Sequence, residues 1–254
     1  MRSLQGMSIL ITGGGSGIGA DCAQRFCEQG ALVTITGRRI EKLEAVQAQL
    51  GDNCRVVQGD VCQQSDRVNM IEMALAHGGG KLDALINNAA NMYRQPVDGY
   101  TEAHLSDAFN TNVISAMMLS SLAVPHLDTT DGAIVFIGST HTRRAFPGAS
   151  PYATTKAALE GLTKVMAAEL GPRQIRVGCI LPGAVSTELN LRAGLFTEAE
   201  AKERYDAVAG LPALGRIGTG TEVAEGIEYL VTAEWVTGVA LEVDGGIGLG
   251  ASYF

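Results

Sequence analysis

The sequence predicts an α/β fold of the doubly wound class, in which a seven-stranded parallel sheet carries helices on both faces. First, short apolar runs alternate with longer amphipathic stretches along the whole chain, and parallel neighbours need such helical crossovers. Second, 46% of the 254 residues are hydrophobic, which is enough for a large core. Third, the chain has 32 glycines and only 5% aromatic residues, a composition that suits closely packed helices and strands joined by tight turns.

The strands are expected at the apolar runs and the helices between them. In chain order the runs are Met7–Thr12, Ala31–Thr36, Cys54–Gln58, Leu82–Asn87, Gly132–Gly138, Ile175–Ile180 and Ala240–Val243. The helical stretches lie near residues 17–29, 39–50, 64–77, 101–127, 151–171 and 220–232. No Ser-rich, Pro-rich or like-charged linker divides the chain, so residues 1–254 are predicted to form a single domain. The segment at about 186–220 breaks the alternation and is predicted to be an excursion or lid.

Composition excludes several classes of function. With 19 Lys and Arg against 27 Asp and Glu, the net charge is −8, so the surface as a whole does not attract nucleic acid or anionic lipid. No apolar run approaches the roughly 18 residues that span a bilayer. A single Arg2 before the apolar run from Met7 does not resemble a signal peptide. We expect a cytoplasmic protein with no nucleic-acid or membrane partner.

The cysteines and histidines do not have the spacing of a metal site. The five cysteines are scattered, without a C-x-x-C pair, which favours free thiols in a reducing compartment. The four histidines also lack metal-ligand spacing. We therefore expect no metal.

The first predicted strand runs directly into a glycine-rich turn, Thr12–Gly19, that opens the first helix. Glycine at such a turn lets the backbone approach a pyrophosphate, and the helix N-terminus offers unpaired N–H groups to the anion. The spacing is G-x-x-x-G-x-G rather than the commoner G-x-G-x-x-G. A plain tight turn is the alternative, but the position between strand and helix favours a dinucleotide site.

The end of the second strand bears on the choice of cofactor. An NAD site usually has an acid about 20 residues past the glycines, whereas this strand ends in Gly37-Arg38-Arg39, with no acid until Glu41. A guanidinium can bind a ribose 2′-phosphate, so NADP(H) is favoured and Arg38, the first after the strand, is the stronger candidate. Both arginines could instead simply begin a solvated helix.

Ser139, Tyr152 and Lys156 are the candidate catalytic set. Tyr152 and Lys156 are four residues apart, so both project from one face of a helix, and Ser139 follows a strand whose carboxyl end should face a ligand. A phenol with a pKa near 10 is a poor base at neutral pH, and a nearby ammonium lowers that pKa. Taken alone, a Tyr–Lys pair is usually surface decoration.

In combination, these motifs resemble the short-chain dehydrogenase/reductase family over nearly the whole chain. The matching features are the glycine turn Thr12–Gly19, Asp60-Val61, Asn87-Asn88-Ala89, Asn112, Ser139, Tyr152-x-x-x-Lys156, Pro182-Gly183 and the tail Val243–Gly246. The resemblance implies a Rossmann-type domain that binds NAD(P)(H) and forms a homotetramer. It also implies that the chain moves a hydride between the nicotinamide and a carbonyl or secondary alcohol carbon.

The resemblance assigns roles to individual residues. Tyr152 would be the general acid–base, Lys156 would bond the nicotinamide ribose and lower the pKa of Tyr152, Ser139 would hold the substrate oxygen, and Asn112 would support a water-mediated proton relay. Asp60 would bond the adenine, Asn87 would line the cofactor strand and Thr187 would touch the carboxamide. The expected cofactor-binding residues are Gly13, Ser16, Gly17, Ile18, Gly19, Arg38, Asp60, Val61, Asn88, Ala89, Tyr152, Lys156, Pro182, Gly183, Val185 and Thr187.

Two positions depart from the family pattern. Ala90 stands where the family has the glycine of Asn-Asn-Ala-Gly, which adds a methyl group beside the cofactor strand. Ser16 stands where NADP-preferring relatives often carry a basic residue. This weakens the expected preference for NADP and leaves an NAD-preferring dehydrogenase as the alternative.

The expected substrate side is largely apolar. Its candidates are His141, Met92, Tyr93, Ala184, Leu191 and Leu195, which suit a carbonyl or alcohol on a hydrophobic body. Arg143 and Arg144 offer an anion contact, although adjacent arginines normally point different ways. A nucleotide-binding regulator without catalysis is the alternative from another functional class.

Overall fold

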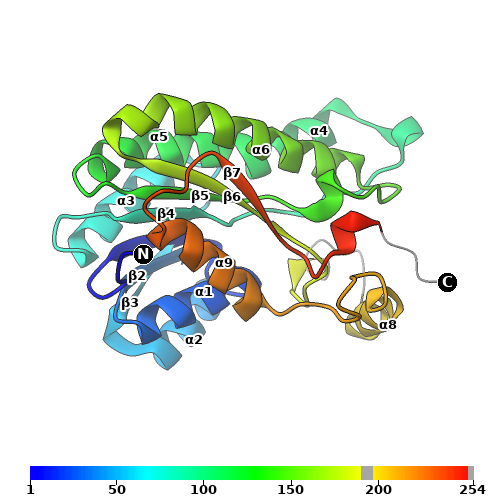
Figure 1. Ribbon diagram of the computed structural model, residues 1–254, viewed down its shortest axis with the longest axis horizontal. Helices are drawn as coiled ribbons and strands as arrows, with labels where there is room; N and C mark the ends of the chain where they lie inside the picture. Colours follow the sequence, from blue (N-terminus) through cyan, green and yellow to red (C-terminus); the bar gives the residue numbers. More distant parts are fainter. Residues whose placement is uncertain (190–196, 251–254) are drawn as a thin grey trace.

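The computed structural model describes residues 1–189 and 197–250 and contains the predicted parallel sheet (Figure 1). Its seven strands pair in the order β3-β2-β1-β4-β5-β6-β7, all parallel. The strands are β1 (Ser8–Thr12), β2 (Leu32–Gly37), β3 (Cys54–Gln58), β4 (Ala84–Asn87), β5 (Ala133–Ile137), β6 (Arg176–Pro182) and β7 (Val239–Val243). The doubly wound fold is therefore confirmed, and the strand ends differ from the expected ones by at most two residues.

Helices cover both faces of the sheet (Figure 1). One layer contains α1 (Gly17–Glu28), α2 (Ile40–Leu50) and α9 (Gly220–Thr232); the other contains α3 (Gln64–His77), α4 (Glu102–Phe109), α5 (Ser115–Leu127) and α6 (Ser150–Leu170). The short helix α8 (Glu198–Val208) lies beyond the carboxyl ends of the strands (Figure 1). Single helical turns lie at Gly51–Asn53, Val97–Gly99, Thr140–Thr142, Gly171–Arg173 and Ile247–Leu249.

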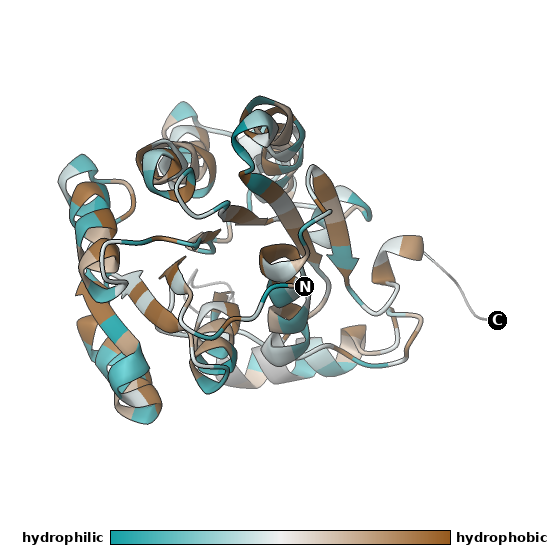
Figure 2. Ribbon diagram, turned by 60° about the vertical axis from the view of Figure 1, so that its left-hand side comes forward, coloured by the Kyte–Doolittle hydropathy of each residue, from teal (hydrophilic) through white to brown (hydrophobic). Residues whose placement is uncertain are grey.

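The core has two halves, one on each side of the sheet, because successive residues of a strand point to opposite faces. In β1, Ile9 and Ile11 pack with Phe26 of α1 on one side, while Leu10 packs toward Leu119 of α5 on the other. Figure 2 shows hydrophobic colour concentrated on the strands and on the inward sides of the helices. None of the helices within 1–189 and 197–250 is long and apolar enough to cross a membrane.

The helix expected at 101–127 is interrupted. A wider π-turn at Asn110–Ile114 separates α4 from α5, and such turns often occur at functional sites. Asn112, in the middle of this turn, is buried and bonded to neighbouring segments. The interruption is therefore fixed by contacts outside the helix, which the periodic pattern of the sequence does not reveal.

The expected excursion at 186–220 is described in part. A bridge joins Val185 to Gly218, and α8 begins with a capping box between Thr197 and Glu200. Residues 190–196 lie outside the described residues, and with them the candidates Leu191 and Leu195.

Candidate active site

A pocket opens along the carboxyl ends of the strands. It lies beside β1 and β4, where the strand order reverses, which is the usual position for ligands in sheets of this type. The turns after β1, β4, β5 and β6 all contribute residues. Its lining extends from the glycine turn to Tyr152 and Lys156, so a ligand bound along it can contact both.

The glycine turn forms one end of this pocket. Gly17 begins α1 with a φ of +53°, in the left-handed region that glycine adopts readily. A Cβ on Gly19 would lie 2.5 Å from the carbonyl oxygen of Gly13, so only glycine lets α1 start this close to β1. The first turn of α1 holds no acidic residue, and Ser16 makes no side-chain cap. The N–H groups and the helix dipole therefore fit a phosphate group.

Hydrogen bonds attach the glycine turn to the end of β4. Thr12 Oγ1 accepts from the backbone N–H groups of Asn88 (3.0 Å) and Ala89 (2.9 Å). In return, Asn88 Nδ2 donates to the carbonyl oxygens of Thr12 (2.8 Å) and Gly13 (3.1 Å). The two segments that would flank a dinucleotide are thus held at a fixed separation.

Three cations follow β2 near the glycine turn, and one of them has a different acidic partner from the other two. Arg38 is mostly exposed and pairs with Asp60 at 4.0 Å. Arg39 Nη2 instead points back to Ser16 Oγ at 3.3 Å and to a carboxylate oxygen of Glu188 at 3.1 Å. Lys42 Nζ lies 3.1 Å from the other oxygen of Glu188. Arg39 and Lys42, rather than Arg38, are therefore the cations that contact the groups around the glycine turn.

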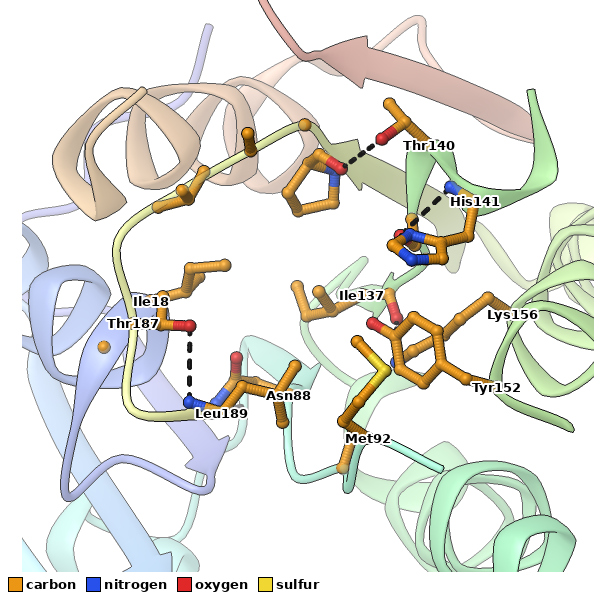
Figure 3. Close-up of a pocket in the computed structure, with 18 of the residues that line it drawn as sticks. Ile18, Asn88, Met92, Ile137, Thr140, His141, Tyr152, Lys156, Thr187 and Leu189 are labelled. Carbon is orange, nitrogen blue, oxygen red and sulfur yellow. Dashed lines mark hydrogen bonds between the residues drawn. The ribbon is translucent and has the colours of Figure 1, made fainter. Parts of the chain in front are cut away.

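Ser139, Tyr152 and Lys156 converge in the pocket, as Figure 3 shows for Tyr152 and Lys156. Pro151 lies in the first turn of α6, where a proline is well tolerated, so that Tyr152 follows at the start of the helix. Lys156 Nζ donates to the carbonyl oxygen of Ile137 at 2.7 Å and lies 5.4 Å from the ring centre of Tyr152. Ser139 is close enough to the phenol to lower its pKa. The three side chains predicted from the sequence thus lie together in the pocket, Ser139 after β5 and the other two on α6.

Burial shifts the pKa values of this set in opposite directions. Desolvation raises the pKa of Tyr152 to about 12, against the opposing effect of the nearby Ser139 hydroxyl. Desolvation also lowers the pKa of Lys156 to about 8, because burial disfavours whichever form is charged. The expected lowering of the Tyr152 pKa by the ammonium is not seen in this structure, in which the burial of the phenol dominates.

Asn112 lies behind the pocket rather than in it. Its Oδ1 accepts from the N–H of Asn91 (2.9 Å), and its Nδ2 donates to the carbonyl of Asn91 (3.0 Å) and to Thr155 Oγ1 (3.1 Å). The amide thus joins the segment after β4 to α6, one residue before Lys156. Among the described contacts, it acts as a brace.

His141 completes the surroundings of the phenol. Its Nδ1 lies 3.1 Å from Ser139 Oγ, and its backbone N–H donates to the same oxygen at 3.2 Å. The ring centre of His141 lies 4.4 Å from that of Phe146, with the two rings tilted, and 5.2 Å from that of Tyr152, which it meets edge-on. Figure 3 shows His141 and Tyr152 on one side of the pocket, with Thr187 and Leu189 opposite.

Most of the predicted cofactor residues line the pocket. Those that do are Gly13, Ser16, Gly17, Ile18, Asn88, Ala89, Tyr152, Lys156, Pro182, Gly183, Val185 and Thr187. Gly19, Arg38, Asp60 and Val61 are not among its lining residues. Asn87, expected on the cofactor strand, points into the core and donates to Ser120 Oγ at 3.0 Å.

The substrate side differs from the expected set. His141, Met92 and Ala184 line the pocket, but Tyr93 does not, since its hydroxyl donates to Asp107 at 2.7 Å. Arg143 is held by Glu160 and Glu242. The lining residues that sequence reasoning missed include Arg94, Thr140, Phe146, Glu188, Leu189, Tyr205, Val208, Leu211 and Ile247. They come from loops and from α8, where no periodic pattern indicates which side chains point inward.

The comparisons with known proteins agree with this geometry. Residues 7–195 match the family model for short chain dehydrogenase. A tropinone reductase homolog of Arabidopsis thaliana is 35% identical over 250 residues, covering 96% of this chain and 93% of that protein.

Solved structures also match. A short-chain dehydrogenase/reductase of Caenorhabditis elegans with cofactor superposes with a TM-score of 0.92, at 26% identity over 99% of this chain and 98% of that one. The 3-ketoacyl-(acyl-carrier-protein) reductase of Brucella melitensis, complexed with NADH, has a TM-score of 0.86 at 30% identity, over 97% of this chain and all of that one.

Three findings lead to one conclusion. They are the parallel sheet with a glycine turn where the strand order reverses, the buried Tyr–Lys pair beside that turn, and the family match over most of the sequence. The chain belongs to the short-chain dehydrogenase/reductase family of NAD(P)-dependent oxidoreductases.

Proposed function

We propose that this protein is an NADP(H)-dependent oxidoreductase acting on a carbonyl or secondary alcohol group. The observation that carries the proposal is the convergence of Ser139, Tyr152 and Lys156 in the pocket that begins at the glycine turn. A bound nicotinamide would supply or accept the hydride there. The tropinone reductase homolog and the ketoacyl reductase among the similar proteins are both named for carbonyl reduction, which supports the same reaction class.

The side chains take complementary roles in this proposal. The phenol of Tyr152 donates a proton to the substrate oxygen during reduction and removes it during oxidation. Ser139 Oγ holds that oxygen, and Lys156 binds the nicotinamide ribose and places a positive charge beside the phenol. Asn112 positions Lys156 through Thr155. With its pKa near 12, Tyr152 carries its proton at neutral pH, which suits it to act as the acid in reduction.

The preference for NADP rests on the cations after β2. Arg38, Arg39 and Lys42 supply three positive charges after β2, and Arg39 contacts Ser16; guanidinium groups bind phosphates through paired hydrogen bonds. The NADH in the Brucella melitensis relative keeps an NAD-preferring enzyme as the second candidate. The remaining proposed cofactor contacts are Asp60 at the adenine, Val61 beside it in the sequence, Thr187 at the carboxamide and the lining residues of the pocket named above.

We also propose a single domain for residues 1–254, a homotetramer and a cytoplasmic location. The assembly is supported by exposed apolar side chains at Ile114 in the π-turn, at Met117 and Met118 on α5 and at Val165 on α6, because groups of exposed apolar side chains mark association surfaces. The location is supported by five cysteines that are all free thiols. Light scattering after gel filtration tests the tetramer directly.

The function is tested by following absorbance of the reduced cofactor over a panel of ketones, with NADPH and NADH compared at equal concentration. We expect turnover of apolar ketones, with kcat/KM higher for NADPH. Arg39→Ala and Arg38→Ala should weaken NADPH more than NADH, while Arg55→Ala, an exposed arginine on β3, should change neither.

Equal use of both cofactors, unchanged in the arginine variants, would contradict the NADP preference. Tight cofactor binding without turnover of any ketone or alcohol would favour a nucleotide-binding regulator instead.

A further inference from the structure

Glu188 connects the segment after β6 to the cations after β2. Its two carboxylate oxygens are each 3.1 Å from a cation, one from Arg39 Nη2 and the other from Lys42 Nζ. Glu188 follows Arg39 by 149 residues and Lys42 by 146. All three side chains are between one-third and one-half exposed. The same Arg39 nitrogen reaches Ser16 Oγ at 3.3 Å, so the carboxylate of Glu188 lies directly beside the glycine turn.

The segment that carries Glu188 covers the glycine turn. The side chain of Thr187 comes within 3.2 Å of the position that a Cβ would occupy on Gly17. Thr187 is held on its other side by Tyr205 of α8, whose hydroxyl accepts from the N–H of Thr187 and donates to its carbonyl, both at 3.2 Å. Residues 185–189 therefore rest on the cradle, with Glu188 as their attachment to α2 and Tyr205 as their attachment to α8.

A carboxylate and a phosphate compete for the same donors. Both are anions that accept hydrogen bonds from guanidinium and ammonium groups, and the cations on Glu188 are two of those proposed above for the ribose 2′-phosphate. The pKa of Glu188 is lowered, chiefly by the hydrogen bond from Lys42 and also by Arg39, so the carboxylate is ionised at neutral pH and holds both cations.

We propose that Glu188 is an internal competitor of the cofactor 2′-phosphate and thereby a determinant of cofactor specificity. Binding of a 2′-phosphorylated cofactor takes Arg39 and Lys42 from Glu188 and releases residues 185–189 from α2. A cofactor without the 2′-phosphate leaves these ion pairs intact. This inference rests on the proposed use of NADP(H), and it adds that the chain weakens its own affinity for the 2′-phosphate.

The test is calorimetric titration of two matched probes, adenosine 2′,5′-bisphosphate and adenosine 5′-monophosphate, into the wild type and Glu188→Gln. The glutamine keeps the shape but removes the charge. We expect Glu188→Gln to bind the bisphosphate about fivefold more tightly, the size expected from two partly exposed ion pairs, and to bind the monophosphate within twofold of the wild type.

Glu41→Gln is the matched control. It removes the same charge from the first turn of α2, and Glu41 belongs to none of the ion pairs found within residues 1–189 and 197–250. It should change the affinity for either probe less than twofold. A fivefold gain in this control, or an equal gain for both probes in Glu188→Gln, would show a general charge effect and overturn the competition.

The two proposals fail in different ways. A wild type that binds both probes equally overturns the NADP preference and the competition with it. A wild type that prefers the bisphosphate, with a preference that Glu188→Gln does not increase, overturns the competition alone.

Hydrogen exchange gives a readout independent of ligand affinity. In the ligand-free protein, Glu188→Gln should speed amide exchange at Thr187 and Leu189, because the attachment to α2 is lost, and Glu41→Gln should not. Unchanged exchange at both amides in Glu188→Gln would show that Glu188 does not hold the segment down.

Discussion

Replacing Lys156 by methionine should make the ligand-free protein more stable at neutral pH. Lys156 is 2% exposed, and desolvation lowers its pKa from 10.5 to about 8. Each unit of pKa corresponds to about 1.4 kcal/mol, so keeping the ammonium charged in the fold costs about 3 kcal/mol at pH 7. The methionine removes that cost but leaves the carbonyl of Ile137 without its donor, which costs about 1 kcal/mol. The expected net gain is about 2 kcal/mol.

The gain should depend on pH in a defined direction. Below pH 8 the folded and unfolded states both carry the proton, and the wild type bears the full cost. Between pH 8 and 10.5 the folded state has lost the proton while the unfolded state keeps it, so wild-type stability rises with pH. The advantage of Lys156→Met should therefore shrink by about 2 kcal/mol between pH 7 and pH 9.5.

Urea unfolding at both pH values, at one protein concentration, measures the difference. Other titrating groups are common to both proteins and cancel. At pH 7 we also expect the melting temperature to rise by about 6 °C, from the usual 2–4 °C per kcal/mol for chains of this size. A variant that is less stable than the wild type, or an advantage that is the same at pH 9.5, would refute the claim that this lysine is held charged against burial.

Three further outcomes follow from the geometry of the site. Gly19→Ala should lower the free energy of unfolding by about 2 kcal/mol and weaken cofactor binding, because the new methyl group meets the carbonyl of Gly13 at 2.5 Å. Urea titration measures the stability and cofactor fluorescence measures the binding. Wild-type values in both assays would contradict the close approach. Asn112→Ala should cost about 2–4 kcal/mol of unfolding free energy in the same urea titration, since it leaves both backbone groups of Asn91 without their partner. A loss below about 0.5 kcal/mol would show that Asn112 does not stabilise the contact between the segment after β4 and α6. His141→Phe keeps the ring but removes the nitrogen beside Ser139 Oγ, so kcat should fall about threefold to tenfold with little change in cofactor KM, and an unchanged kcat would show that Ser139 needs no such partner.

The alternation of strands and helices is readable from the sequence because each buried strand needs a continuous apolar run and each crossover an amphipathic stretch. The π-turn at Asn110–Ile114 is not readable, because Asn112 within it is held by hydrogen bonds shared with residues 21 and 43 positions away. The periodic pattern of 101–127 is the same whether or not the helix widens there.

The candidate site divides in a similar way. Tyr152 and Lys156 are predictable together because four-residue spacing on a helix fixes a shared face. The sequence does not predict which arginine reaches the glycine turn. Arg39 rather than Arg38 does so beside the carboxylate of Glu188, which follows Arg39 by 149 residues. Such a contact follows only from the path of the chain after β6.

The most direct test of the central claim is Tyr152→Phe, which removes only the phenolic oxygen from the proposed acid–base set. NADPH fluorescence should show binding within a few-fold of the wild type, while hydride transfer to a ketone that the wild type reduces, followed by absorbance of the reduced cofactor, should fall at least 1,000-fold, on the order expected for loss of a general acid. Full hydride transfer in a variant that still binds NADPH would contradict the account.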